Sequence, residues 1–248
     1  MTLGNGWLWP VLVAPFIGSF LGCVVVRLPS GRPVVWDRSA CDLCGHPLAA
    51  RDLVPIASWL ALRGRCRYCG GKIALRVLLI ELGAVATAFW AASVAQGPML
   101  WASCLLGWML YALALIDLDA AILPDVLTLP LLVLGLAATA YFAPSQLADA
   151  VIGAVAGFLF FAALRWLYRT LRRREGLGLG DAKLLAASGA WVSWTGLPSV
   201  VLVAALASLT LVLLMALRGQ PTAGDRRLAF GPALCFGTWI VWLYGALP

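Results

Sequence analysis

The sequence predicts an all-α polytopic membrane protein with about eight transmembrane helices and a small cytoplasmic zinc-binding loop domain. Of its 248 residues, 62% are hydrophobic and only 12% are charged, whereas a soluble domain carries roughly a quarter charged residues. Long apolar runs recur along the chain, and the mean hydropathy is +0.94. The stretch between the first two runs carries two closely spaced cysteine pairs. These three observations predict the fold class.

Spans of about 20 apolar residues cross a bilayer as helices. Eight segments meet or approach this length: residues 7–26, 76–95, 99–118, 126–142, 147–167, 182–194, 197–217 and 229–247. The sixth is short enough to be a partial span. The first lacks a preceding basic region and a cleavage-site pattern, so we expect a retained span rather than a secretory signal. No internal repeat is apparent.

The basic residues predict the orientation of these spans. All 18 Lys and Arg lie in three segments, with nine in residues 27–76, six in residues 165–183 and three in residues 218–227. The positive-inside rule makes these segments cytoplasmic, which leaves both termini outside. Because topology accounts for every basic residue, the net charge of +7 does not indicate a nucleic-acid partner.

The predicted domains are a first transmembrane helix (1–27), a cytoplasmic metal-binding domain (28–75) and a membrane-embedded core (76–248). In the second, Cys41 and Cys44 form one C-x2-C pair and Cys66 and Cys69 form another. Two such pairs build a tetrahedral Zn(Cys)4 site, which is structural because it leaves no open position for water. Disulfides are the alternative, but the reducing cytoplasm disfavours them. His46 is a candidate replacement ligand, although a solvated loop histidine is the simpler interpretation.

Two carboxylates end apolar runs, where ionisable groups are costly and therefore suspect as functional groups. Asp117 follows residues 99–116, and Asp181 closes the tetrad 178–181 (GLGD) before another run. We expect the two to act as an acid pair that activates water, one as general base and one as general acid. The alternative is a pair of interfacial carboxylates that snorkel or bind the basic run 172–174.

Four further charged residues are candidates near this pair. Asp119 and Asp125 are expected in the cytoplasmic turn, as supporting or substrate-contacting residues, and Asp119 points about 200° away from Asp117 if the helix continues. Lys183 either anchors its helix end at the headgroups or tunes the nearby acid. Glu81, inside a span, is expected to pair with a loop arginine.

Several of these motifs occur together in one known family. Residues 114–119 (ALIDLD), 123–125 (LPD) and 175–185 (EGLGLGDAKLL) resemble those of the bacterial prepilin peptidases, or type IV leader peptidases, which are GxGD aspartic proteases of the inner membrane. Residues 18–21 (GSFL), 27–29 (RLP), 230–232 (FGP) and the cysteine pairs are also similar. The resemblance covers nearly the whole chain in the same order.

The resemblance implies that Asp117 and Asp181 are catalytic, with Gly178 and Gly180 as the glycines of GxGD. It also implies the substrates, which are prepilins or pseudopilins of type IV pili or type II secretion, cut after a leader glycine on the cytoplasmic side. Many members then methylate the new N-terminus with S-adenosylmethionine. The implied location is the bacterial inner membrane, in contact with lipid and with periplasmic termini.

The chain departs from the family at residues outside the acid pair. Gly22 stands where Asn is common, and Val77-Leu78 stands where Tyr-Pro is common, whereas Glu81 matches the family's acid. The differences at Gly22 and Val77-Leu78 bear on the methyl-transfer activity rather than on cleavage. Glu81 is a candidate to serve methyl transfer, as the alternative to pairing with a loop arginine.

Other classes of protein make different predictions. A proton-coupled transporter would carry acids at mid-span, and a membrane scaffold that docks through the metal domain would not need either aspartate. A presenilin-type protease shares GxGD but lacks the cysteine loop.

Overall fold

The computed structural model describes residues 5–34, 38–172, 178–218 and 229–247. The chain divides into two compact units, residues 1–108 and 109–248. The described residues contain α-helices and short 3-10 turns, with no β-strand among them. The helices are α1 (Leu8–Arg27), α2 (Ala57–Ala61), α3 (Leu75–Val94), α4 (Gly97–Ala120), α5 (Asp125–Phe142), α6 (Leu147–Arg172), α7 (Leu179–Leu217) and α8 (Gly231–Tyr244).

Six of these helices are long and apolar enough to cross a membrane: α1, α3, α4, α5, α6 and α7. α8 is apolar but shorter, with 14 residues. Each of the eight predicted segments coincides with helix over most of its length, and the last, 229–247, is helical over Gly231–Tyr244. This confirms the all-helical membrane class. The sixth and seventh are the two halves of α7, joined at Ser193, whose φ of 55° and ψ of −179° interrupt the helix. The sixth segment is therefore one half of a kinked 39-residue helix.

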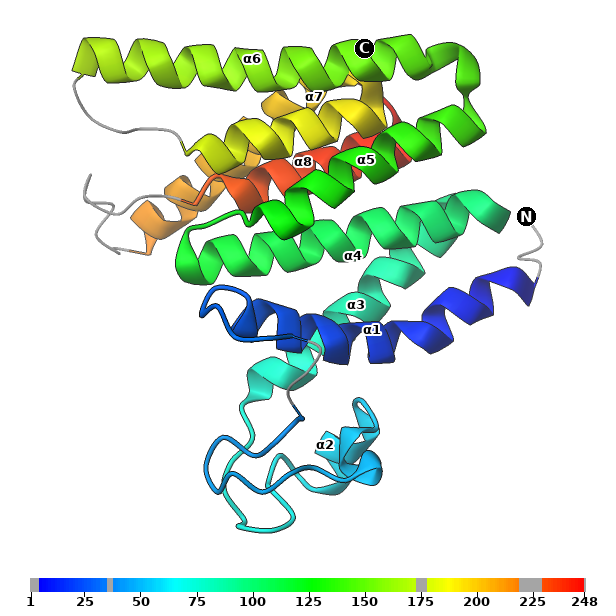
Figure 1. The fold of residues 1–248 in the computed structure, drawn as a ribbon, viewed down its shortest axis with the longest axis vertical. Helices are drawn as coiled ribbons and strands as arrows, with labels where there is room; N and C mark the ends of the chain where they lie inside the picture. Colours follow the sequence, from blue (N-terminus) through cyan, green and yellow to red (C-terminus); the bar gives the residue numbers. More distant parts are fainter. Residues whose placement is uncertain (1–4, 35–37, 173–177, 219–228, 248) are drawn as a thin grey trace. The chain divides into compact units, whose positions relative to one another are not determined.

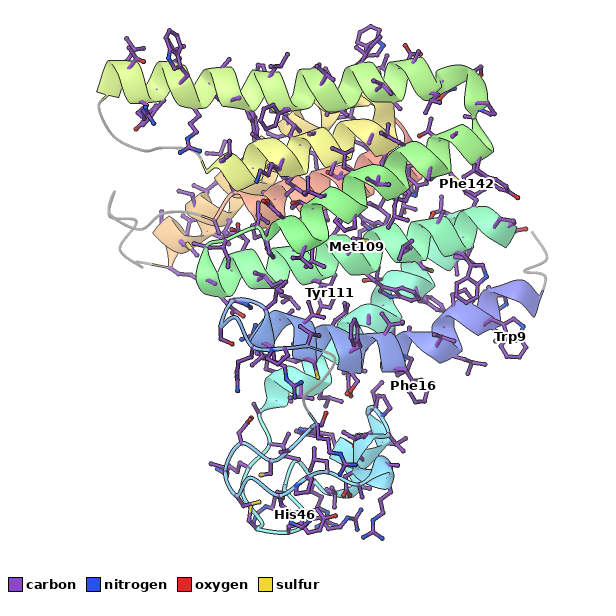
Figure 2. The ribbon with its side chains drawn as sticks, viewed as in Figure 1. Trp9, Phe16, His46, Met109, Tyr111 and Phe142 are labelled. Atoms are coloured by element: carbon purple, nitrogen blue, oxygen red, sulfur yellow. The ribbon has the colours of Figure 1, made fainter. Side chains whose placement is uncertain are left out.

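In the first unit, α1 packs directly against α3 (Figure 1). The contact depends on Gly18, where an added Cβ would lie 2.6 Å from the Glu81 Cα atom. Small residues at such a crossing let membrane helices approach closely. Trp9 and Phe16 project outward from α1 (Figure 2), and both side chains are exposed. Such exposed aromatic residues on an apolar helix are suited to contact with lipid.

In the second unit, α7 is the central helix, and α5, α6 and α8 all pack on it (Figure 1). The α6–α7 contact is nearly backbone to backbone, because a Cβ on Gly189 would lie 2.3 Å from the carbonyl carbon of Gly153. The α7–α8 contact is similarly close, because a Cβ on Gly237 of α8 would lie 2.5 Å from the Val200 carbonyl oxygen of α7. These contacts hold the N-terminal half of α7 in the core of the unit, where nearly all of residues 182–191 are buried.

Aromatic and hydroxyl side chains complete the packing around this half of α7. The Trp191 indole N–H donates to the Leu131 carbonyl of α5 at 2.9 Å. The Thr139 hydroxyl, also on α5, donates to the Ala190 carbonyl at 3.1 Å, just before the break at Ser193. Both bonds join α5 to the N-terminal half of α7 within apolar surroundings, where polar groups need a partner inside the protein.

Candidate functional sites

The first candidate site is an acid pair in the second unit. Asp117 lies in the last turns of α4, and its side chain is almost fully buried, with the residue 7% exposed. α4 continues to Ala120, so Asp117 and the exposed Asp119 face different directions, as the helical period requires. One carboxylate oxygen of Asp117, Oδ2, accepts the backbone N–H of Gly231 at 3.1 Å. A buried carboxylate with a backbone donor is held in one orientation.

Asp181 lies in the first turn of α7, where the free N–H groups of the helix start favour negative charge. Its Oδ2 atom accepts the backbone N–H of Gly178 at 3.2 Å, which folds the GxGD turn around the carboxylate. Asp181 and Asp117 interact electrostatically across the site. The structure therefore brings together the two carboxylates that the sequence paired, from the end of one helix and the start of another.

Two glycines leave the space that this arrangement needs. A Cβ on Gly231 would lie 2.6 Å from Asp117 Oδ2, and a Cβ on Gly180 would lie 2.9 Å from the Leu123 Cβ atom in the α4–α5 turn. Gly178 and Gly180 thus serve different purposes, since the first donates to Asp181 and the second lets α7 approach the turn.

The remaining candidates in this unit are arranged around the start of α7. Lys183 Nζ lies 2.6 and 2.8 Å from the two carboxylate oxygens of Asp125, the first residue of α5. The side chains of the basic run 172–174, considered above as partners for the acids, lie outside the described part of the chain.

Sequence reasoning missed two contributions to the acid site. One is the backbone N–H of Gly231, one of the unpaired donors that every helix start presents. A Gly-Pro pair before an apolar run is a helix-start signal, and it was available in the sequence. The other is Cys235, a buried thiol one turn further along α8 and near both acids, which was not among the predicted site residues.

Glu81 belongs to the first unit, in α3, and is 4% exposed. Its Oε2 atom accepts the backbone N–H of Ile56 at 2.6 Å, and the Ser19 hydroxyl is a second hydrogen-bond partner. Ile56 has a φ of 61° in a tight turn in which the Ala57 N–H donates to the Pro55 carbonyl. The buried carboxylate therefore joins α1, α3 and the cysteine-bearing loops.

The second candidate site is the cysteine cluster of the first unit. The sulfur atoms of Cys41, Cys44, Cys66 and Cys69 all lie within 4.8 Å of one another. The Cys41 and Cys69 sulfurs are 3.9 Å apart, close to the roughly 3.8 Å separation that a tetrahedral site with 2.3 Å bonds requires. All seven cysteines of the chain are free thiols. The cluster is suited to binding a metal ion.

The two cysteine turns are built alike, which reveals a 25-residue repeat that the sequence analysis missed. The Cys41 N–H donates to the His46 carbonyl, the Gly45 N–H to the Cys41 carbonyl and the Leu48 N–H to the Ser39 carbonyl. The same three bonds recur 25 residues later, in residues 64–73. Each turn ends in a glycine at positive φ, and an isolated antiparallel bridge closes each one. Only the cysteines and one glycine are identical, too few for detection by sequence alone.

The thiols of Cys41 and Cys69 have different pKa values. Backbone N–H groups of Cys44 and Leu43 lower the pKa of Cys41 to about 7. The Gly71 N–H acts in the same direction on Cys69, but the neighbouring Cys44 thiol, desolvation, and the thiols of Cys66 and Cys41 together raise its pKa to about 11. Crowding of four thiols thus disfavours four thiolates unless a cation offsets their repulsion.

His46 lies at the edge of the cysteine loops (Figure 2), and its ring stacks on Tyr68 with centroids 3.7 Å apart. Among the described residues, the cluster with metal-ligand geometry comprises the four cysteines. The stacking joins the two cysteine turns, since His46 follows one pair and Tyr68 lies within the other.

Comparisons with known proteins cover both units. Residues 12–95 match the family described as Bacterial Peptidase A24 N-terminal domain, and residues 104–215 match the Type IV leader peptidase family. A protein of Aeromonas hydrophila named prepilin leader peptidase/N-methyltransferase is 40% identical, over 98% of this chain and 93% of its own length.

Proteins with the same name from Burkholderia pseudomallei and Pseudomonas aeruginosa are 42% and 37% identical, over 92% and 95% of this chain and 82% and 89% of their own lengths. No solved structure matches. Together with the acid pair and the cysteine cluster, these similarities show that the chain belongs to the type IV leader peptidase family.

Proposed function

We propose that this protein is a membrane aspartic endopeptidase that removes the leader peptides of type IV prepilins or pseudopilins. Asp117 and Asp181 are its catalytic pair. The observation that carries the proposal is that these carboxylates, one at the end of α4 and one at the start of α7, are near enough to interact electrostatically, each with a backbone N–H donor. The family membership and the names of the relatives support the substrate class.

The chemistry follows from two acids placed side by side. Two neighbouring carboxylates repel each other when both are ionised, so such a pair favours a state that holds one proton between them. The ionised member takes a proton from the attacking water, and the protonated member gives its proton to the leaving amine. The Gly231 N–H holds one oxygen of Asp117, which leaves the other oxygen available to water.

The substrate meets this pair at a membrane surface. Prepilin leaders are short and basic, and in this proposal they are cut after a glycine on the cytoplasmic side of the bacterial inner membrane. The positive-inside rule puts the cysteine loops on that side and both termini in the periplasm. The apolar segment of the substrate then lies among the spans, and its leader reaches the ends of α4 and α7.

The cysteine cluster is proposed to hold a structural Zn²⁺ through Cys41, Cys44, Cys66 and Cys69. Zinc would supply a cross-link between the two turns of the repeat rather than a reactive centre, since four sulfur ligands fill its coordination sphere. The relatives' names add a second activity, N-methylation of the new N-terminus, for which S-adenosylmethionine is the proposed methyl donor.

The test is processing of a prepilin substrate by the purified protein in detergent, with the product's N-terminus read by mass spectrometry. We expect cleavage after the leader glycine by wild type and none by Asp117→Asn or Asp181→Asn. Asp119→Asn makes the same chemical change at a neighbouring aspartate outside the proposed catalytic pair, and this variant should still cleave the substrate. Addition of S-adenosylmethionine should add one methyl mass to the wild-type product.

Cleavage by either Asp117→Asn or Asp181→Asn would refute the acid pair. Absence of cleavage by wild type on any pilin substrate, with both variants complementing secretion or pilus assembly in cells, would favour the scaffold alternative.

A further inference from the structure

We infer that Asp125 and Lys183 form a positioning pair that sets the alignment of Asp181 with Asp117. The inference rests on the proposed function, because it assigns these two residues a role in the same reaction. It differs from both roles that sequence reasoning offered Lys183, which were a headgroup anchor and a direct influence on the neighbouring acid. It also removes Asp125 from the residues expected to touch substrate.

The geometry joins the two segments that carry the acids. Asp125 begins α5 and is separated from the end of α4 only by the turn at residues 121–124. Lys183 lies two residues after Asp181, and its Nζ atom contacts both carboxylate oxygens of Asp125, at 2.6 and 2.8 Å. Residues two apart on a helix point about 200° from each other. Lys183 therefore binds the start of α5 from the side of α7 that faces away from the Asp181 carboxylate.

A second contact between the same segments limits how the start of α7 is placed against the α4–α5 turn. Gly180 lies against Leu123 so closely that a Cβ would come within 2.9 Å of the Leu123 Cβ atom. The glycine contact sets how near the start of α7 approaches the α4–α5 turn, and the ion pair sets how α7 is rotated about its axis. Distance and rotation together determine where the Asp181 carboxylate lies relative to Asp117, which is on the last turns of α4.

Stability alone does not account for this pair. The side chains of Lys183 and Asp125 are 28% and 54% exposed, and ion pairs with that exposure contribute little to the free energy of unfolding. Orientation is different, because reacting groups displaced by about 1 Å can lose a hundredfold in rate. We therefore expect loss of the pair to lower kcat while the thermal unfolding midpoint changes little.

The experiment is a charge-exchange cycle on the full-length protein in detergent, with kcat and KM measured on a prepilin substrate. The variants are Asp125→Lys, Lys183→Asp and the double variant that carries both. We expect each single variant to lose about ten- to a hundredfold in kcat with little change in KM. The double variant should recover at least tenfold over the worse single variant, since it restores an opposite-charge pair in reverse order.

Matched controls separate positioning from other roles. Asp125→Asn removes one charge of the pair and should lower kcat. Asp149→Asn makes the same chemical change at an aspartate that accepts the Trp194 indole N–H of α7 at 3.1 Å, and it should leave kcat unchanged. Unfolding midpoints for all variants should lie close to that of wild type.

Three results would overturn the inference: single variants with wild-type kcat, a double variant no better than the single ones, or a rise in KM at unchanged kcat, which would indicate substrate contact. If these variants behave normally while Asp117→Asn and Asp181→Asn abolish cleavage, only the positioning role fails. If the latter two still cut, the proposed function itself fails.

Discussion

The backbone N–H of Gly231 donates to Asp117 Oδ2 at 3.1 Å, and a Cβ on Gly231 would lie 2.6 Å from that same oxygen. The start of α8 thus both holds the carboxylate and leaves room for it. Residues 114 positions apart in the sequence meet at this point. The relationship links a glycine that carries no functional side chain to the chemistry of an acid on another helix.

Gly231→Ala should lower kcat for leader cleavage by about a hundredfold, because the added methyl group displaces the Asp117 carboxylate from its donor. The measurement is single-substrate kinetics on purified protein. Gly22→Ala in α1 is the control, since a Cβ there meets nothing within 4 Å, and its kcat should match wild type. An active Gly231→Ala protein would show that the close contact is not needed for cleavage.

Substitution of any one cluster cysteine, for example Cys66→Ser, should abolish stoichiometric metal binding, because three thiolates and a hydroxyl bind zinc much more weakly than four thiolates. Metal content per chain, measured by mass spectrometry of the digested protein, tests this. Cys23→Ser, outside the cluster in α1, should keep one zinc per chain. Equal zinc in both variants would argue against the four-cysteine site.

Glu81→Ala should loosen the turn around Ile56, because the Ile56 N–H loses its acceptor. An unsatisfied donor costs about 1–3 kcal/mol. Limited proteolysis and hydrogen exchange across residues 50–62 should report faster opening than in wild type. Glu81→Gln keeps an acceptor oxygen and should open less. Equal protection in wild type and Glu81→Ala would mean that this contact does not hold the loops.

The ion pair between Asp52 and Arg67 predicts that the stability of the cysteine loops depends on pH. The Arg67 guanidinium, above all, lowers the pKa of Asp52, and the Tyr68 hydroxyl adds to the shift. A folded pKa below the unfolded value of about 3.9 means that stabilisation is complete above that value and is lost as pH falls through the lowered one.

The unfolding midpoint of wild type should therefore exceed that of Asp52→Asn at pH 6, and the difference should shrink below about pH 4. Pairwise comparison at each pH cancels acid effects common to both proteins. A difference that stays constant down to pH 3 would contradict the assignment.

Local patterns in the sequence were sufficient for the helices and for the cluster of four cysteines. Apolar runs of the right length became helices because a bilayer leaves backbone groups no other partner. The cysteine ligands followed from spacing, since each C-x2-C turn brings two sulfurs together without help from distant residues. The acid pair was predicted because carboxylates at the ends of apolar runs are rare without a function, a cost that is independent of the fold.

Tertiary structure decided what depends on contacts between distant segments. The partner of Lys183 is Asp125, 58 residues away, and no local pattern distinguishes that contact from a lipid headgroup. The same holds for the Gly231 donor and for the acceptance of the Ile56 N–H by Glu81. The break at Ser193 lies beside Gly153 of α6, where an added Cβ would come within 2.7 Å of the Ser193 carbonyl carbon, and a hydropathy profile contains no such contact. The sequence by itself therefore determined which residues are chemically suited to act, and the packing of α4, α5, α7 and α8 determined which of them meet.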